Sequence, residues 1–108
     1  MSNTERIREL NDQLRATGTG GKIILTQGVL AQGEETVRQV LLAMKHYTAF
    51  HPDNDPYGEH DFGAIEYQGK KYFWKIDYYD HSFTMHSPDA ADPTVTCRVL
   101  TLMLAEEY

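Results

Sequence analysis

Residues 71–80 have the clearest side-chain alternation in the chain, and their aromatic and branched residues are typical of a β-strand. Successive side chains of a strand point to opposite faces of the sheet. We expect one of these faces to lie in the core. The other mixes aromatic rings with charges, which indicates a surface that contacts something polar. The first face carries Tyr72, Trp74, Ile76 and Tyr78, and the second carries Phe73, Lys75, Asp77 and Tyr79.

Two helices are predicted before this strand, over residues 4–17 and 34–48, because apolar residues recur there at helical spacing. Ser2 and Glu5 resemble a capping box at the start of the first helix. Gly18 follows its last turn, where glycine commonly ends a helix. The apolar stripes consist of Ile7, Leu10 and Leu14 in the first helix and of Val37, Val40, Leu41 and Met44 in the second.

Three further strands are predicted from runs of branched and aromatic residues. Residues 62–67 and 71–79 are separated by a Gln-Gly turn, which favours a hairpin. Residues 83–86 are predicted to continue this meander as its third strand. Residues 22–30 form an N-terminal strand that joins one edge of the meander.

A third helix is predicted at the end of the chain. Asp92 is a suitable cap, and Pro93 suits the first helical position because its missing N–H has no partner there. The expected buried stripe consists of Val95, Val99, Leu102 and Met103, widened by Leu100 and Leu104.

These elements give the order α-β-α-β-β-β-α within a single α+β domain, residues 1–108. The expected sheet is four-stranded and antiparallel, built from the three-strand meander and the N-terminal strand. Helices should pack on one of its faces. We expect them to cover the face that carries Trp74.

The chain carries 16 acidic and 10 basic residues among 108, a net charge of −6. Direct binding of nucleic acid requires a positive patch that neutralises phosphates, so this charge argues against it. The charge suits a protein partner with a basic surface, and it also favours solubility.

Cys97 is the only cysteine, so no disulfide can form within the chain and the core must supply the stability. We expect this thiol to be a small half-buried core residue. No signal peptide is evident, and no apolar run approaches the ~20 residues that span a bilayer. A cytoplasmic location is therefore expected.

Residues 51–61 contain the densest polar cluster in the chain. Part of the cluster follows a calcium-loop pattern, but Ala64 stands where that loop needs a bidentate Glu. His60 and Asp61 could form a hydrolase site or, with His81 and His86, a zinc site. Their spacing matches no zinc pattern, so the leading expectation is no catalytic residue, no metal and no cofactor.

Several segments carry a resemblance to a known family, and they extend over nearly the whole chain. They are GTGGKIILTQGV from residue 18, NDPYGEHDFG from residue 54, FWKIDYYD from residue 73 and RVLTLMLAEEY from residue 98. The sequence resembles a family of small bacterial proteins of unknown function found on plasmids and integrative elements. The resemblance implies no catalytic residue. It suggests an accessory or anti-defence role.

The leading hypothesis is a small, acidic, non-enzymatic protein-binding module. It would act as an anti-CRISPR or anti-restriction inhibitor that occupies a basic surface of a nucleic-acid-handling defence complex. The alternatives are the His60/Asp61 hydrolase or metal protein and a homodimeric scaffold that pairs through an exposed sheet edge. The expected binding residues are Asp53, Asp55, Tyr57, Glu59, Asp77, Tyr79 and Asp80.

Overall fold

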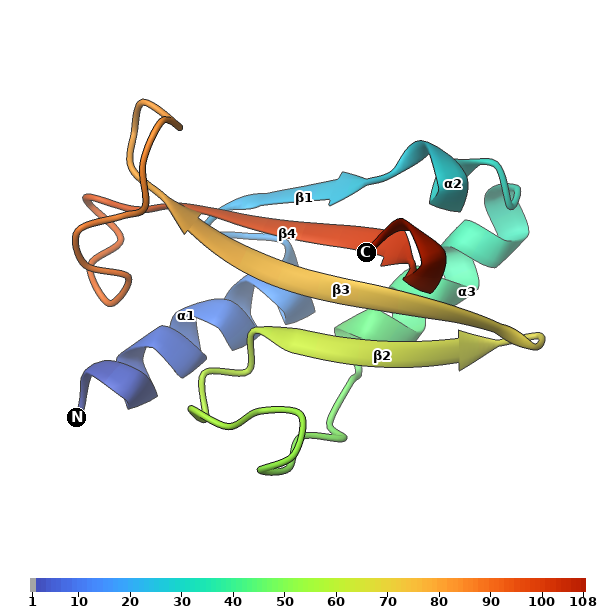
Figure 1. The fold of residues 1–108 in the computed structure, drawn as a ribbon, viewed down its shortest axis with the longest axis horizontal. Coiled ribbons are helices and arrows are strands. Elements are labelled where there is room, and N and C mark those ends of the chain that lie inside the picture. The colour runs from blue at the N-terminus through green and yellow to red at the C-terminus, as the bar shows by residue number, and fades with distance from the viewer. Residues whose placement is uncertain (1) are drawn as a thin grey trace.

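A four-stranded sheet organises the computed structural model, which describes residues 2–108 (Figure 1). Its strands lie in the order β1-β4-β3-β2. β3 runs antiparallel to both β2 and β4, whereas β1 runs parallel to β4. The strands are β1 (Lys22–Leu25), β2 (Phe62–Tyr67), β3 (Lys70–Tyr79) and β4 (Cys97–Leu104).

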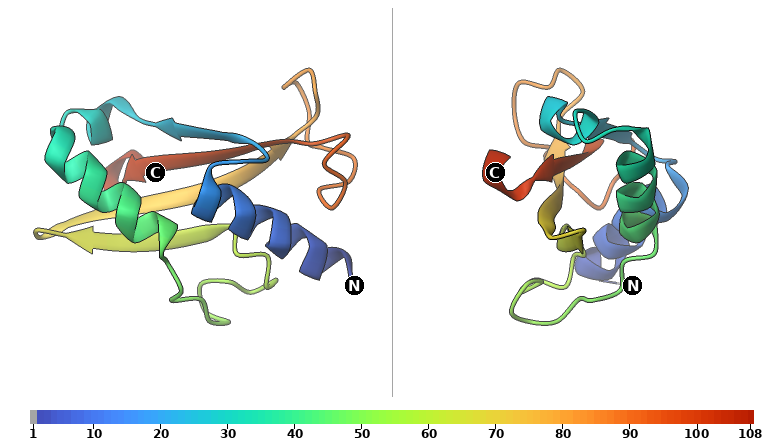
Figure 2. Two further views of the ribbon diagram at one scale, coloured as in Figure 1. Left: turned by 180° about the vertical axis from the view of Figure 1, so that it is seen from behind. Right: turned by 90° about the vertical axis from the view of Figure 1, so that its right-hand side faces the viewer.

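Two helices, α1 (Asn3–Thr17) and α3 (Glu34–Lys45), form one layer on one face of this sheet (Figure 2). The single-turn α2 (Gln27–Leu30) follows β1, and a 3₁₀ turn, η1 (Ala105–Glu107), follows β4. Figure 2 shows α1 and α3 on the same side of the sheet and the C-terminal turn on the other. None of the helices within residues 2–108 is long and apolar enough to cross a membrane.

The α+β class and the core face of the central strand are confirmed. Tyr72, Trp74, Ile76 and Tyr78 of β3 are all buried. They pack in one cluster with Leu14 of α1, Val40 and Met44 of α3, and leucines of β4. Burial of these large apolar side chains is the main stabilising contribution available to a chain without disulfides.

The capping signals of the first helix are also confirmed. The Ser2 hydroxyl accepts a hydrogen bond from the Glu5 backbone N–H at 3.1 Å. Gly18 ends α1 with φ of 76°, a left-handed conformation that costs glycine no steric strain. The second predicted helix is present as well, although α3 ends at Lys45 rather than near residue 48.

The predicted hairpin between β2 and β3 is present, with Tyr67 opposite Lys70. Both turn residues, Gln68 and Gly69, have positive φ, at 49° and 78°. Two successive left-handed residues match the twist of a two-residue hairpin turn.

The prediction of a C-terminal helix is wrong, because this segment forms β4. The strand lies between β3 and β1, so the backbone groups along both of its edges are paired. Leu100 and Leu102 point into the helix layer, and Val99 and Met103 on the opposite face are buried too. A strand buried on both faces shows a continuous apolar run, which a buried helix segment also shows. Asp92 caps only a turn, where it accepts hydrogen bonds from Thr94.

The expected meander and the all-antiparallel sheet are also wrong. Residues 83–86 form a loop whose one ladder contact is an isolated bridge between His86 and Tyr79. β4 occupies the position beside β3 that this segment was expected to fill. The sheet is mixed, because β1 joins β4 in parallel. β1 ends at Leu25, since the Thr26 side chain caps α2 by accepting from the Val29 N–H.

Candidate functional site

The face of the sheet opposite the helix layer is the leading candidate for a functional surface. Cross-strand register places Phe73, Lys75, Asp77 and Tyr79 of β3 on this face. No helix of eight or more residues within the described chain packs over it (Figure 2). We call it the open face.

Aromatic rings cover one end of the open face. Phe62 of β2 and Phe73 of β3 lie with ring centroids 5.1 Å apart. Tyr108, which follows η1, packs edge-on against both, at 6.0 Å and 5.6 Å. Tyr108 is nevertheless 76% exposed. The Tyr108 ring, an apolar body with a polar tip, is thus presented to solvent beside two strand-borne phenylalanines, and tyrosine is enriched at protein interfaces for this reason.

A polar hollow of about 440 Å³ lies beside these rings. Lys75 Nζ lies 3.0 Å from Asp77 Oδ2 at this hollow, and the hydrogen bond to Asp77 raises the pKa of Lys75. The carboxylates of Asp77 and Glu107 outnumber the single ammonium of Lys75, so the side chains that line the hollow carry a net charge of −1. It is lined by Thr26, Lys75, Asp77, Tyr79, Thr101, Met103, Glu107 and Tyr108.

Glu107 supports the hollow structurally. One of its carboxylate oxygens, Oε1, accepts hydrogen bonds from the Thr26 hydroxyl at 2.6 Å and from the Leu104 N–H at 2.8 Å. The bond from Thr26 is the main cause that lowers the pKa of Glu107. These contacts tie η1 to the end of β1. The lining residues of β4 and η1 do not follow from the helix predicted for the last segment, because a helix would not align them with β3.

Asp77 and Tyr79 are the two predicted binding residues that the structure brings together, at the hollow. Asp80, the next residue, turns away into the loop after β3. Its carboxylate accepts hydrogen bonds from the N–H groups of Ser82 and Thr84 and from the Ser82 hydroxyl. The Ser82 hydroxyl bond is the largest cause that lowers the pKa of Asp80. Asp80 therefore orders a loop.

The four predicted residues of the 51–61 loop divide into two pairs. Asp55 is buried and accepts from the His60 N–H at 3.1 Å, and Glu59 accepts from the Tyr78 hydroxyl at 2.8 Å. Tyr78 points into the helix layer, so Glu59, which is partly exposed, and the buried Asp55 lie on the helix side of the sheet and are separated from the open face. Asp53 and Tyr57 are exposed, with Tyr57 at 78%.

His60 lies in a closed network rather than at an open site. Its Nδ1 is 2.8 Å from Asp12 Oδ1, and its Nε2 is 3.6 Å from Asp55 Oδ2. Its ring stacks on Phe50 with centroids 3.7 Å apart. Among residues 2–108, no group of three or more His, Cys, Asp or Glu side chains is arranged to hold a metal ion. The hydrolase and metal alternatives therefore gain no support from the geometry.

Burial, and secondarily the nearby Glu59, raises the pKa of Asp61 above its ordinary value of 3.8. An unfolded chain then ionises Asp61 at lower pH than the folded chain, so the carboxyl reduces stability as pH rises from 3.8 through the folded pKa. We expect Asp61→Asn to gain stability over the wild type as pH rises from about 4 to about 7. Urea unfolding of both proteins across this range measures the difference. Asp80 and Glu107 also have shifted pKa values, but they are present in both proteins, so their effects on the stability difference cancel. A stability difference between the two proteins that stays constant with pH would contradict the expectation.

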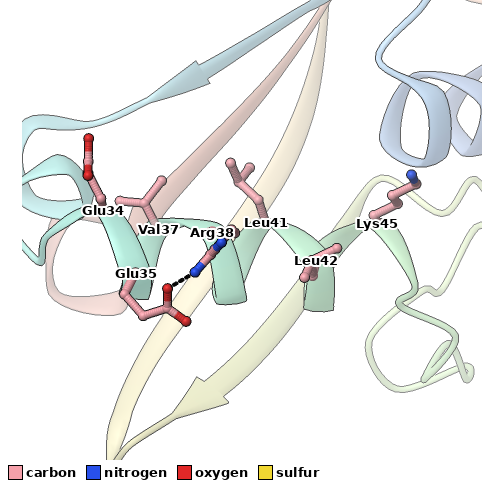
Figure 3. A pocket seen from close by; sticks show the side chains of 7 residues that line it. All are labelled: Glu34, Glu35, Val37, Arg38, Leu41, Leu42 and Lys45. Carbon is pink, nitrogen blue, oxygen red and sulfur yellow. Dashed lines mark hydrogen bonds and ion pairs between the residues drawn. The ribbon is translucent and has the colours of Figure 1, made fainter.

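A larger hollow, about 660 Å³, runs along the outer side of α3 (Figure 3). Its floor is apolar, and charged side chains border it at both ends. All of its residues come from one helix, whereas ligand sites usually combine polar groups that converge from several elements. We therefore favour the smaller hollow on the open face. The α3 hollow is lined by Glu34, Glu35, Val37, Arg38, Leu41, Leu42 and Lys45.

Comparison of the chain with curated proteins and with solved structures finds no match. A family model described as a protein of unknown function, DUF3768, matches residues 25–107. This match runs from the end of β1 to η1 and so includes the open face except for the first residues of β1 and Tyr108. It confirms the expected membership of a family of unknown function. The chain thus belongs to the DUF3768 family of proteins of unknown function.

Proposed function

We propose that this chain is a non-enzymatic protein-binding module that contacts its partner through the open face. The observation that carries the proposal is an aromatic cluster, with Tyr108 exposed, beside a carboxylate-containing hollow on the open face. Tyr and Phe supply large contact areas with few rotatable bonds, and strands hold them in fixed positions. Asp53 and Tyr57, exposed on the neighbouring loop, would add a second contact.

The charge distribution favours a partner with a basic surface. Two of the 10 basic residues, Arg15 and Arg98, are buried, but among the 16 acidic residues just Asp55 is. The surface is therefore more acidic than the net charge of −6 implies. An acidic surface speeds encounter with a basic one and disfavours binding to phosphate backbones.

The resemblance to proteins carried on bacterial plasmids and integrative elements leads us to propose the class of target. Nucleic-acid-handling complexes of bacterial defence systems expose basic surfaces to their substrates. An acidic module in the cytoplasm could occupy such a surface, as an anti-CRISPR or anti-restriction inhibitor would. A homodimer that pairs through an exposed sheet edge stays a separate prediction, and light scattering of the purified chain tests it.

Binding of the purified chain to a panel of purified restriction and CRISPR effector complexes tests the proposal. For any complex that binds, Asp77→Lys combined with Tyr79→Ala should weaken the affinity by about tenfold or more, since both side chains line the hollow. Glu34→Lys is the matched control, because it makes the same charge change on α3 in the other layer. Equal loss of affinity in the control, or none in the double variant, would refute the open face as the binding surface.

A further inference from the structure

A thiol and an imidazole lie together at the far end of the open face, away from the aromatic cluster. The Cys97 Sγ is 3.4 Å from the His81 Nδ1. Cys97 is the first residue of β4 and is partly exposed, whereas His81 lies in the loop after β3 and is exposed. The predicted C-terminal helix would instead make Cys97 a half-buried core residue. In the observed β3–β4 register, Tyr79 pairs with Cys97. This pairing brings the loop after β3, which carries His81, close to the thiol.

The contact made by Nε2 of the His81 ring determines which ring nitrogen carries the proton. Nε2 lies 2.5 Å from the backbone carbonyl oxygen of Thr94. A carbonyl can only accept a hydrogen bond, so Nε2 carries the proton and Nδ1 of the neutral ring presents its lone pair to the sulfur. The Cys97 thiol is therefore the donor to His81. A nucleophile, a base and a third group that orients the base are the parts of an activated nucleophile.

Two aspartate-capped turns hold this arrangement on either side. Asp80 accepts from the Ser82 and Thr84 N–H groups and so fixes the loop that carries His81. Asp92 accepts from the Thr94 N–H at 2.9 Å and so fixes the turn that supplies the carbonyl. The imidazole is thus positioned independently of its contact with the thiol.

The surroundings are open to a small reagent and include a cation. The thiol lies across from Tyr79, and Phe83 packs against that ring with centroids 5.9 Å apart. Lys22 of β1 lies at the same end of the sheet, with its ammonium 5.0 Å from the Phe83 ring centroid. Reactive thiols typically lie partly exposed, beside a histidine or another cationic group.

We propose that Cys97 is a reactive thiol that His81 activates for exchange with small-molecule disulfides. His81 Nδ1 takes the thiol proton, and the thiolate attacks one sulfur of the disulfide. A new S–S bond forms to Cys97 while the original S–S bond breaks, and the departing thiolate takes up the proton. Cys97 is oxidised and the departing sulfur is reduced, so no further oxidant is needed. The adduct would lie beside Tyr79 on the open face, although the inference does not depend on partner binding.

The rate of reaction with 4,4′-dithiodipyridine, an uncharged disulfide, tests the proposal at neutral pH. His81→Ala should react several-fold more slowly than the wild type, because it lacks the base. Removal of a side chain that merely shielded the thiol would instead make the reaction faster. His81→Gln keeps a donor for the Thr94 carbonyl but has no base, so it should be slow as well.

His86→Ala is the matched control, since this exposed histidine lies in the same loop and its Nδ1 faces the Ser87 carbonyl instead of the thiol. It should react at the wild-type rate. All forms should react equally in denaturant, which normalises for thiol content. With glutathione disulfide, mass spectrometry should show one adduct on the wild type and none on Cys97→Ser. Equal or faster reaction of both His81 variants, or absence of the adduct, would overturn the proposal.

Discussion

Replacing Asn11 with alanine should lower the free energy of unfolding by about 3 kcal/mol. Asn11 is fully buried on α1. Its Nδ2 donates to the Tyr78 hydroxyl at 2.8 Å and to the Glu59 carbonyl at 3.0 Å, and its Oδ1 accepts from the Arg98 Nε at 2.6 Å. The substitution would leave a charged, buried guanidinium N–H without its partner. Loss of a partner from a buried charged group costs more than loss of a neutral hydrogen bond.

Arg98 makes this network unusually sensitive. Its guanidinium lies 5.1 Å from the Tyr78 ring centroid and also donates to the Ala90 carbonyl. Burial, the largest cause, lowers the pKa of Arg98. The charged guanidinium is therefore less stable here than in water and depends on its hydrogen-bond partners. Asn11 therefore joins α1, β3, β4 and the loop before β2 through one side chain.

Chemical denaturation of Asn11→Ala, Gln13→Ala, Arg98→Met and the double variant Asn11→Ala/Arg98→Met measures this coupling. Gln13→Ala, two residues along α1 and exposed, is the control and should change stability by less than about 0.5 kcal/mol. Arg98→Met removes the charge that needs Asn11, so Asn11→Ala should cost clearly less in that background. Equal cost of Asn11→Ala with and without Arg98 would show that the network is not coupled.

Gly63→Ala should destabilise the protein by about 2 kcal/mol. Gly63 of β2 lies directly opposite Trp74 of β3, and a Cβ atom there would come within 2.4 Å of the indole Nε1. Trp74 is fully buried, and the rings of Tyr47 and Phe50 pack edge-on against it at 5.5 Å and 6.0 Å. The indole therefore has no space into which it can retreat.

A double-mutant cycle with Trp74→Phe identifies the cause. The atoms that the new Cβ would meet are Nε1, Cε2 and Cζ2 of the indole, and phenylalanine lacks this part of the ring system. Gly63→Ala should therefore cost much less in the Trp74→Phe background. Ala64→Gly, at the next and exposed position of β2, reports the backbone cost of glycine, about 0.5–1 kcal/mol. Equal cost of Gly63→Ala in both backgrounds would exclude the overlap as its cause.

For the open face, the local sequence pattern predicts which side chains of one strand lie together. The alternation in β3 placed Asp77 and Tyr79 together on an exposed face, because side-chain direction along a strand depends only on its own residues. Asp55 and Glu59 come from the polar loop of residues 51–61, where no periodicity indicates which groups their carboxylates meet. Their carboxylates are satisfied by His60 and Tyr78, and these contacts depend on how the loop docks against α1.

The amino-acid sequence by itself determined the elements whose signals are local: α1 with its caps, α3 with its apolar stripe, the β2–β3 hairpin and the core face of Trp74. Tertiary structure alone decided that residues 97–104 form a strand, since an apolar run buried on both faces has no period that separates strand from helix. It also decided the parallel pairing of Lys22 with Val99 and the meeting of Cys97 with His81. Each of these joins distant segments, and their energies come from contacts that exist only once β4 lies between β1 and β3.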